Sequence, residues 1–341
     1  MIVIIISVLE KEYLLFYDAN IVTNKKQYAI GIDLGGTNMP CSLVDDCGRI
    51  VTTIEKRTLS EQGPDAVVSK IVESTNEIVK FFKEKINNGN IIGVGLGAPG
   101  VLDLEKGEIV TGPNLNGWKN VPIVRLIEEQ INLPVKMDND ANCAAIGEHW
   151  SGAAKGTQNA ILVTLGSGVG GGIIINGSIY RGSHGTAGEI GHITIIPDGY
   201  KCGCGNSGCL EAYASANATV KRAVELLRKK ETRSALKERV LEEITAHDIF
   251  ISAEDGDVFS KHILEESGRY LGIGIATLAN IFDPDAIIIG GGFSSAEKYL
   301  FPTAIEEAYR RSFKYVMDNI KIVKAKLGND AGIVGAAKLL F

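Results

Sequence analysis

The sequence has no apolar run long enough to cross a membrane. Its most hydrophobic stretch, from Met1 to Leu9, is far shorter than the roughly 20 residues that a spanning helix needs. The same stretch lacks the basic flank and the small-residue cleavage site of a secretory signal. We therefore expect a cytoplasmic protein with no membrane partner. Residues 1–26 are treated as an N-terminal extension whose structure the sequence does not define.

Positive charge is also in short supply. Lys and Arg number 35 against 41 Asp and Glu, which gives a net charge of -6, and no basic patch is interleaved with aromatic residues. A nucleic-acid partner therefore gains no electrostatic support, and none is expected. With 341 residues, of which 45% are hydrophobic and 22% charged, the chain is long enough for two ordinary globular domains.

Proline is scarce, with 9 residues, whereas glycine contributes 40 and gathers at the ends of expected strands. The pattern predicts an antiparallel meander over residues 28–54 and a helix over 64–85. Strand and helix then alternate from residue 91 to residue 165, which indicates parallel strands with crossover helices and an α/β fold. Further expected elements are a mainly helical region at 217–281, a solvated surface helix at 228–243 within it, a buried strand at 286–289 and a closing helix at 330–339.

A strand, a glycine turn and a second strand occur twice, at residues 28–44 and 160–176. Backbone N–H groups of such turns converge on phosphate oxygens, so two turns facing across a cleft can hold one nucleotide. A dinucleotide-binding fingerprint is the competing interpretation, but it needs a turn that opens into a helix, and both turns here open into strands. The predicted ATP contacts, the last three of them against the adenosine, are Gly35, Gly36, Thr37, Asn38, Gly166, Ser167, Gly168, Gly170, Gly171, Gly290, Gly291 and Gly292.

The polar segment 138–140 ends an expected strand and begins an alanine-rich helix. One of its residues caps the helix, but three exceed what a cap needs. The helix N-terminus favours the anionic form of a carboxylate, so Asp140 is expected to stay ionised and to accept a proton from a substrate hydroxyl. Asp33 would hold the Mg2+ that bridges the phosphates, through water. The candidate carbohydrate ligands are Asn114, Asn139, Asp140, Glu189, His192 and Glu211.

Cysteine is also infrequent, yet three of the six cysteines lie within eight residues among glycines. Together with a nearby histidine they form the ligand set of a tetrahedral structural zinc. The alternative is three reduced, buried thiols beside a core histidine, and a disulfide is disfavoured in the cytosol. The isolated Cys41, Cys47 and Cys143 are interpreted as small core residues. The predicted zinc ligands are His192, Cys202, Cys204 and Cys209.

These motifs resemble the ROK family of repressors, open reading frames and kinases, and within it the bacterial glucokinase type. The resemblance runs from about Gln27 to Phe341 and is carried by segments 33–37, 139–140, 165–171 and 189–211. It implies an actin/hexokinase-like, ribonuclease H-like fold of two α/β domains with an inter-domain cleft. It also implies ATP-dependent phosphorylation of the 6-hydroxyl of glucose, with Asp140 as base, and a homodimer or higher homo-oligomer.

The resemblance also implies domain boundaries. A small domain at 27–138 would carry the first phosphate turn and be completed by the C-terminal helix 330–341, and a large domain would span 139–329. Two features depart from the family: residues 1–26 have no counterpart, and Pro40 falls inside a strand next to the first phosphate turn. Proline removes a ladder hydrogen bond, so the geometry of that hairpin is in question.

Other functions remain open at this point. The substrate could be fructose, mannose or N-acetylmannosamine, and the donor could be ADP or polyphosphate. A sugar-binding regulator is a second class, although some 26 residues with little basic charge do not build a winged helix-turn-helix. An actin-like or chaperone ATPase that binds no sugar is a third class. The polar cluster at Asn139, Asp140, Glu189 and His192 argues against it, because these side chains favour a polyol substrate.

Overall fold

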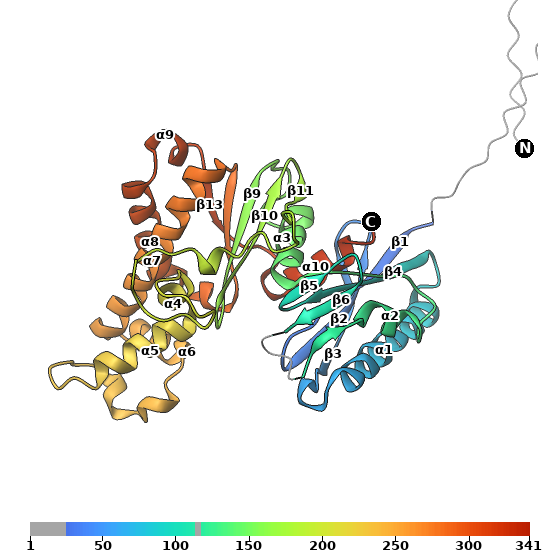
Figure 1. Cartoon of the computed structure of the whole chain (residues 1–341), viewed down its shortest axis with the longest axis horizontal. Coiled ribbons are helices and arrows are strands. Elements are labelled where there is room, and N and C mark those ends of the chain that lie inside the picture. The colour runs from blue at the N-terminus through green and yellow to red at the C-terminus, as the bar shows by residue number, and fades with distance from the viewer. Residues whose placement is uncertain (1–24, 113–116) are drawn as a thin grey trace, which may run out of the picture.

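The computed structural model describes residues 25–112 and 117–341. Most of the N-terminal extension and the predicted sugar ligand Asn114 lie outside these residues. The described chain is mixed α/β and forms two lobes, each built on a five-stranded sheet (Figure 1). None of its helices combines the length and the apolar character needed to span a membrane.

The first sheet has the order β3-β2-β1-β4-β8. Its strands are β1 (Gln27–Asp33), β2 (Asn38–Asp45), β3 (Ile50–Arg57), β4 (Asn90–Ala98) and β8 (Val135–Asn139). The first three form the predicted antiparallel meander, and β4 and β8 run parallel to β1. Helix α1 (Pro64–Phe81) begins at the predicted proline and buries Val67, Val68, Ile71 and Ile78 in the core of this lobe.

Pro40 does not disturb the first hairpin. The pairing of β2 with β1 ends at Cys41, opposite Ile32, so Pro40 lies beyond the part of β2 that has neighbours on both sides. There it pairs in register with Glu55 of β3 alone. Proline is tolerated where no ladder hydrogen bond is required, and this explains its place in the strand.

A small three-stranded sheet that the sequence did not indicate follows β4. It consists of β5 (Val101–Asp103), β6 (Glu108–Thr111) and β7 (Lys119–Val121), with α2 (Ile123–Glu128) after it. Its strands have three or four residues each, too few to show a period-two pattern. Ile109 and Val121 bury against the core of the first lobe.

The second sheet repeats the strand order of the first. It consists of β9 (Ala160–Leu165), β10 (Val169–Ile175), β11 (Ser178–Ile179), β12 (Ala286–Gly290) and β13 (Lys321–Lys324), in the order β11-β10-β9-β12-β13. Strand β10 pairs antiparallel with β9, and β12 pairs parallel with both β9 and β13. The recurrence predicted from the two glycine turns therefore extends to the topology of the whole sheet.

Six helices, some of them short, complete this lobe: α4 (Glu211–Ala214), α5 (Ala216–Leu227), α6 (Ala246–Glu254), α7 (Val258–Phe282), α8 (Glu297–Arg311) and α9 (Lys314–Met317). The surface helix predicted at 228–243 is wrong, because α5 ends at Leu227 and only two short 3-10 turns follow. Leu236 is buried within this charged stretch and holds the chain against the core. Leu241, partly buried, packs against the same core.

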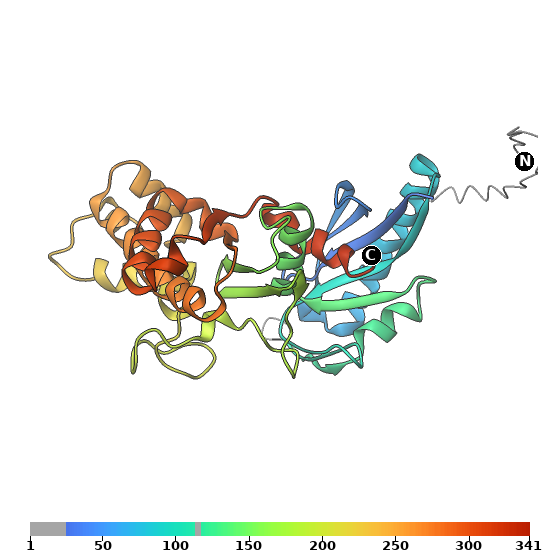
Figure 2. The same ribbon diagram turned by 90° about the horizontal axis from the view of Figure 1, so that it is seen from above.

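Two helices cross between the lobes (Figures 1 and 2): α3 (Asp140–Ser151) and α10 (Ala331–Lys338). Their backbones approach so closely that a Cβ at Gly335 would collide with the carbonyl of Cys143, and one at Gly147 with that of Ala331. The C-terminal α10 also packs against β1 and β4 and so covers the first sheet.

The isolated cysteines do not all behave as predicted. Cys41 and Cys143 are buried core residues, as expected, but Cys47 is exposed and the prediction for it is wrong. Cys47 lies in the turn between β2 and β3, where its N–H donates to the Asp45 carboxylate at 3.0 Å. Turn formation places its side chain in solvent.

Candidate active site

A cleft with a cavity volume of about 1220 Å³ is lined by both lobes. From the first lobe come Asp33, Asn38, Pro40 and Glu55, and from the second come the glycine turn after β9 and the end of β12. The described lining contains seven carboxylate residues and no lysine or arginine. These seven are Asp33, Glu55, Asp138, Asp140, Glu148, Glu189 and Glu211.

The first glycine turn is anchored by residues that the sequence analysis missed. Thr58 donates through its hydroxyl to the carbonyl of Gly35 at 2.6 Å and through its N–H to the carbonyl of Thr37 at 2.8 Å. The hydroxyl of Ser60 donates to the carbonyl of Gly36 at 2.8 Å. The carbonyls of the turn are thereby occupied. Asp33 and Asn38 line the cleft, whereas Gly35, Gly36 and Thr37 are not part of its lining.

The second glycine turn contributes all five of its predicted contacts to the cleft: Gly166, Ser167, Gly168, Gly170 and Gly171. Its backbone is fixed from two sides, because the N–H of Val169 donates to the Glu211 carboxylate at 3.0 Å and Ala216 donates to the carbonyl of Gly166 at 2.9 Å. At the predicted adenosine end, Gly290 and Gly291 line the cleft, and Gly292 does not.

Asp140 is the first residue of α3, and Asn139 is its N-cap. The Asn139 side chain accepts hydrogen bonds from the N–H groups of Ala141 and Asn142, which leaves the Asp140 carboxylate with one backbone partner, Ala141, at 2.8 Å. Burial raises the pKa of Asp140, and the charge of Glu189 raises it further. The hydrogen bond from Ala141, at the helix N-terminus, lowers the pKa of Asp140 as predicted, but burial outweighs it. The expectation that this site favours the anionic form is therefore wrong.

Asp33 faces the same space from the other lobe. Burial and the negative charge of Asp140 raise the pKa of Asp33 to about 6. Two buried carboxyl groups with raised pKa values, in a cleft whose described lining has no lysine or arginine, suit a divalent cation, which prefers oxygen ligands and would relieve the repulsion. The residues present therefore fit the predicted Mg2+.

The four predicted zinc ligands come together. Their ligand atoms all lie within 4.8 Å of one another, with Cys204 Sγ 3.7 Å from Cys209 Sγ and His192 Nδ1 3.6 Å from Cys202 Sγ. Tetrahedral zinc with Zn–S bonds of about 2.3 Å separates two sulfurs by about 3.8 Å. The cluster has the spacing that a single tetrahedral ion requires.

The metal cluster adjoins the predicted sugar ligands. His192 turns Nδ1 toward Cys202 and Nε2 toward Glu189, whose carboxylate lies 3.8 Å away. Glu211 lies 3.5 Å from Cys202 Sγ and also holds the second glycine turn through Val169. Asn139, Asp140, Glu189, His192 and Glu211 all line the cleft, so five of the six predicted ligands share one cavity.

A contact that the sequence analysis missed lies beside Asp140. The Asp138 carboxylate is buried and binds Arg181, with Nε at 2.8 Å and Nη2 at 2.6 Å. Its other oxygen accepts from the N–H of Asn139 and the side-chain amide of Asn142. No local motif marks Arg181, since its partner lies 43 residues away.

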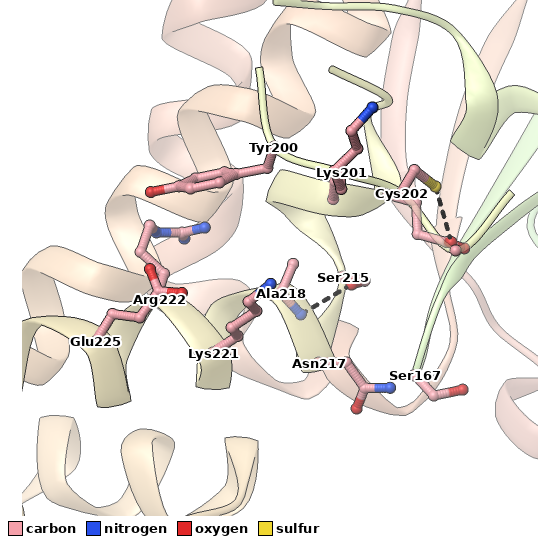
Figure 3. A pocket seen from close by; sticks show the side chains of 13 residues that line it. Ser167, Tyr200, Lys201, Cys202, Ser215, Asn217, Ala218, Lys221, Arg222 and Glu225 are labelled. Atoms are coloured by element: carbon pink, nitrogen blue, oxygen red, sulfur yellow. Dashed lines mark hydrogen bonds between the residues drawn. The ribbon is translucent and has the colours of Figure 1, made fainter. Parts of the chain in front are cut away.

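A smaller pocket of about 280 Å³ adjoins the cleft (Figure 3). Ser167, Gly203, Glu211 and Asn217 line both cavities. Lys221, Arg222 and Glu225 of α5 and Tyr200 form its other wall. Arg222 is not free for a ligand, because it donates to the Tyr213 carbonyl and the Ser267 hydroxyl and pairs with Glu266.

Two sheets of one topology, which both contribute residues to a shared cleft, define a two-domain protein of the actin/hexokinase-like class. The chain belongs to the ROK family, whose sequence model matches residues 29–341. The glucokinase of Halalkalibacterium halodurans is 39% identical over 316 residues, covering 92% of this chain and 95% of that protein.

Two further relatives show the breadth of the family. A ROK family glucokinase from Streptomyces griseus, in complex with glucose and AMPPNP, has a TM-score of 0.75 and 34% identity, covering 92% of this chain and 98% of its own. The xylose repressor of Bacillus subtilis is 32% identical, over 94% of this chain and 79% of the repressor.

Proposed function

We propose that this chain is an ATP-dependent glucokinase, which transfers the γ-phosphoryl group of ATP to the 6-hydroxyl of glucose. The observation that carries the proposal is the single cleft that Asp140 and the predicted sugar ligands share with Asp33, Asn38 and the glycine turn after β9. The glucokinase of Halalkalibacterium halodurans and the glucose and AMPPNP complex of the Streptomyces griseus protein support both substrates.

In this reaction Asp140 accepts the proton of the 6-hydroxyl while the oxygen attacks the γ-phosphorus and the bond to the β-phosphate oxygen breaks. The products are glucose 6-phosphate and ADP. A carboxylate with a raised pKa is a better proton acceptor than an ordinary one, which suits Asp140 to the role. Asp33 would hold Mg2+, and the bound ion would supply positive charge to the phosphates.

The remaining side chains orient the substrates. We infer that Asn139, Glu189, His192 and Glu211 bind the sugar hydroxyls, and that the N–H groups of the turn after β9 bind phosphate. Zinc on His192, Cys202, Cys204 and Cys209 would fix the His192 ring so that Nε2 is directed to Glu189 and the sugar. Gly290 and Gly291 provide a bare backbone surface for the adenosine.

The domain division at residues 138–139 and 329–330 is likewise a proposal. It is supported by two separate hydrophobic clusters, one under each sheet, and by the packing of α10 on β1 and β4. The homo-oligomeric state and the cytoplasmic location stay predictions.

The test is a panel of sugars crossed with phosphoryl donors. Glucose, fructose, mannose and N-acetylmannosamine are each incubated with ATP, ADP or polyphosphate, and phosphorylated products are identified by mass spectrometry. We expect glucose with ATP to give the highest kcat/KM. A panel in which glucose gives no product, or in which ATP does not serve as donor, would contradict the proposal.

A further inference from the structure

We propose that Arg181 is a positioning residue for the phosphoryl transfer: its ion pair with Asp138 holds the proton acceptor and the sugar-binding loop in one geometry. This inference rests on the proposed function. Arg181 itself does not line the cleft, whereas Asp138 does. Arg181 therefore acts through Asp138 and not on the substrate.

The first part of the argument is the environment of Asp138, one residue before the N-cap of α3. Its side chain is 1% exposed, and each carboxylate oxygen has two polar partners. One oxygen binds Nε and Nη2 of Arg181, and the other binds the N–H of Asn139 and the amide of Asn142. The carboxylate thus ties Asn139 and Asn142, which lie on either side of Asp140 in the chain, to one guanidinium.

The second part is the place of Arg181 in the chain. It follows β11, and its carbonyl accepts a hydrogen bond from Ala187 at 3.0 Å, which closes the loop 181–187. Gly188 comes next with φ +93 and packs against the carbonyl of Gly171, and then Glu189 enters the cleft. A positive φ and that close approach leave room only for glycine. The base of the loop that carries Glu189 is therefore fixed to Asp138.

One ion pair consequently links β8 of the first sheet to the segment that follows β11 of the second. Asp140 follows β8 at the start of α3, and Glu189 follows the loop that begins at Arg181. Both side chains line the cleft, and the charge of Glu189 raises the pKa of Asp140. Two guanidinium N–H groups on one carboxylate oxygen fix the direction of the contact, which the single ammonium of a lysine does not. A displacement of about 1 Å at a reacting group costs about 100-fold in rate.

The experiment is a double-mutant cycle on the full chain with Arg181→Gln, Asp138→Asn and the double variant, and with Arg181→Lys as the conservative change. For each protein, kcat, both KM values and the melting temperature are measured, and glucose affinity is measured by calorimetry without turnover. We expect Arg181→Gln to lower kcat by about 10- to 100-fold. The KM and the dissociation constant for glucose should rise, and the KM for ATP should change less than about twofold, because the ATP contacts lie on other elements.

The cycle separates positioning from stability. The double variant should be no worse than the poorer single variant, because both residues act through one pair, and Arg181→Lys should lie between wild type and Arg181→Gln. The control is Arg310→Gln, which breaks another forked pair, with Glu307 on α8, and should leave kcat unchanged. If Arg181→Gln does not fold, the double variant, which leaves no unpaired buried charge, and Arg181→Lys still test the prediction.

Three results would overturn the inference: an unchanged kcat and glucose affinity in Arg181→Gln, losses that multiply in the double variant, or a rise of both KM values in step with the fall in melting temperature. A wild-type chain that does not phosphorylate glucose would instead refute the proposed function. In that case the calorimetric arm is repeated with the sugar that the panel identifies.

Discussion

At the scale of single residues, Asp140 is the proton acceptor that we propose. Replacing it with Asn keeps the shape of the side chain but removes the proton acceptor. We expect kcat of Asp140→Asn to fall by about 10²- to 10⁴-fold. Because burial disfavours the charge of Asp140, the melting temperature should not decrease. A coupled assay and a thermal melt measure both, and a variant with wild-type kcat would exclude Asp140 as the base.

Asp33 gives the protein a pH-dependent stability. Its pKa is about 6 in the fold against an ordinary value of 3.8, so between these values the folded state binds more protons than the unfolded state. The free energy of unfolding therefore falls as pH rises from about 4 to 6, by at most about 3 kcal/mol. We expect Asp33→Asn to melt at a higher temperature than wild type at pH 7 but not at pH 4, with chelator present.

The control for this measurement is Asp46→Asn, which changes an exposed carboxylate in the β2–β3 turn. It should leave the pH dependence as in wild type. An Asp33→Asn protein that differs from wild type equally at both pH values would contradict the assignment. Sequence reasoning located Asp33 because it ends a strand and Asp140 because it begins the helix after one, but it gave the wrong direction for the pKa of Asp140. Burial in a cleft depends on the opposite lobe, which local sequence does not describe.

At the scale of elements, the loop 192–209 is predicted to need its metal for sugar affinity before it needs it for folding. His192 belongs to both the metal cluster and the cleft. We expect Cys204→Ser to lower the zinc content below one per chain and to raise the KM for glucose by about 10- to 100-fold. The KM for ATP should change little. Zinc is measured by mass spectrometry of the purified protein.

Cys47→Ser is the matched control, since Cys47 is exposed and lies outside this cluster. A zinc-free wild type with full glucose affinity would refute the prediction.

The spacing of the cysteines was enough to predict the cluster, because all four ligands lie within 18 residues of one another. Charged composition was a poorer guide at 228–243, where Leu236 and Leu241 pack against the core and no long helix forms.

At the scale of the whole molecule, the distribution of charge in the cleft makes a prediction about ATP. The described lining contains seven carboxylates, and its only basic side chain is His192. Free ATP, with its own negative charge, meets repulsion that backbone N–H groups alone do not offset. We expect ATP affinity to fall at least about 100-fold when Mg2+ is removed. Calorimetry with and without chelator measures it, and glucose affinity, which should not change, is the control.

Equal affinity for ATP with and without Mg2+ would contradict this prediction.

The two-lobed architecture was predictable as a whole because the strand and glycine pattern occurs twice. The contacts that join distant segments were not. Arg181 finds Asp138 across 43 residues, and Thr58 and Ser60 hold a turn more than 20 residues before them. Such pairs depend on how the sheets are assembled, which periodicity does not report.

The position of α10 has a consequence for synthesis on the ribosome. Strand β1 ends at Asp33, and the helix that covers it begins at Ala331, about 300 residues later. At a synthesis rate of roughly 5–20 residues per second, one face of the first sheet stays uncovered for about 15–60 s before α10 is made. Ala29 of β1 and Ala337 of α10 share one buried cluster, which cannot form until the end of the chain has emerged. A nascent chain stopped before residue 331 should therefore expose an apolar sheet face and bind chaperones.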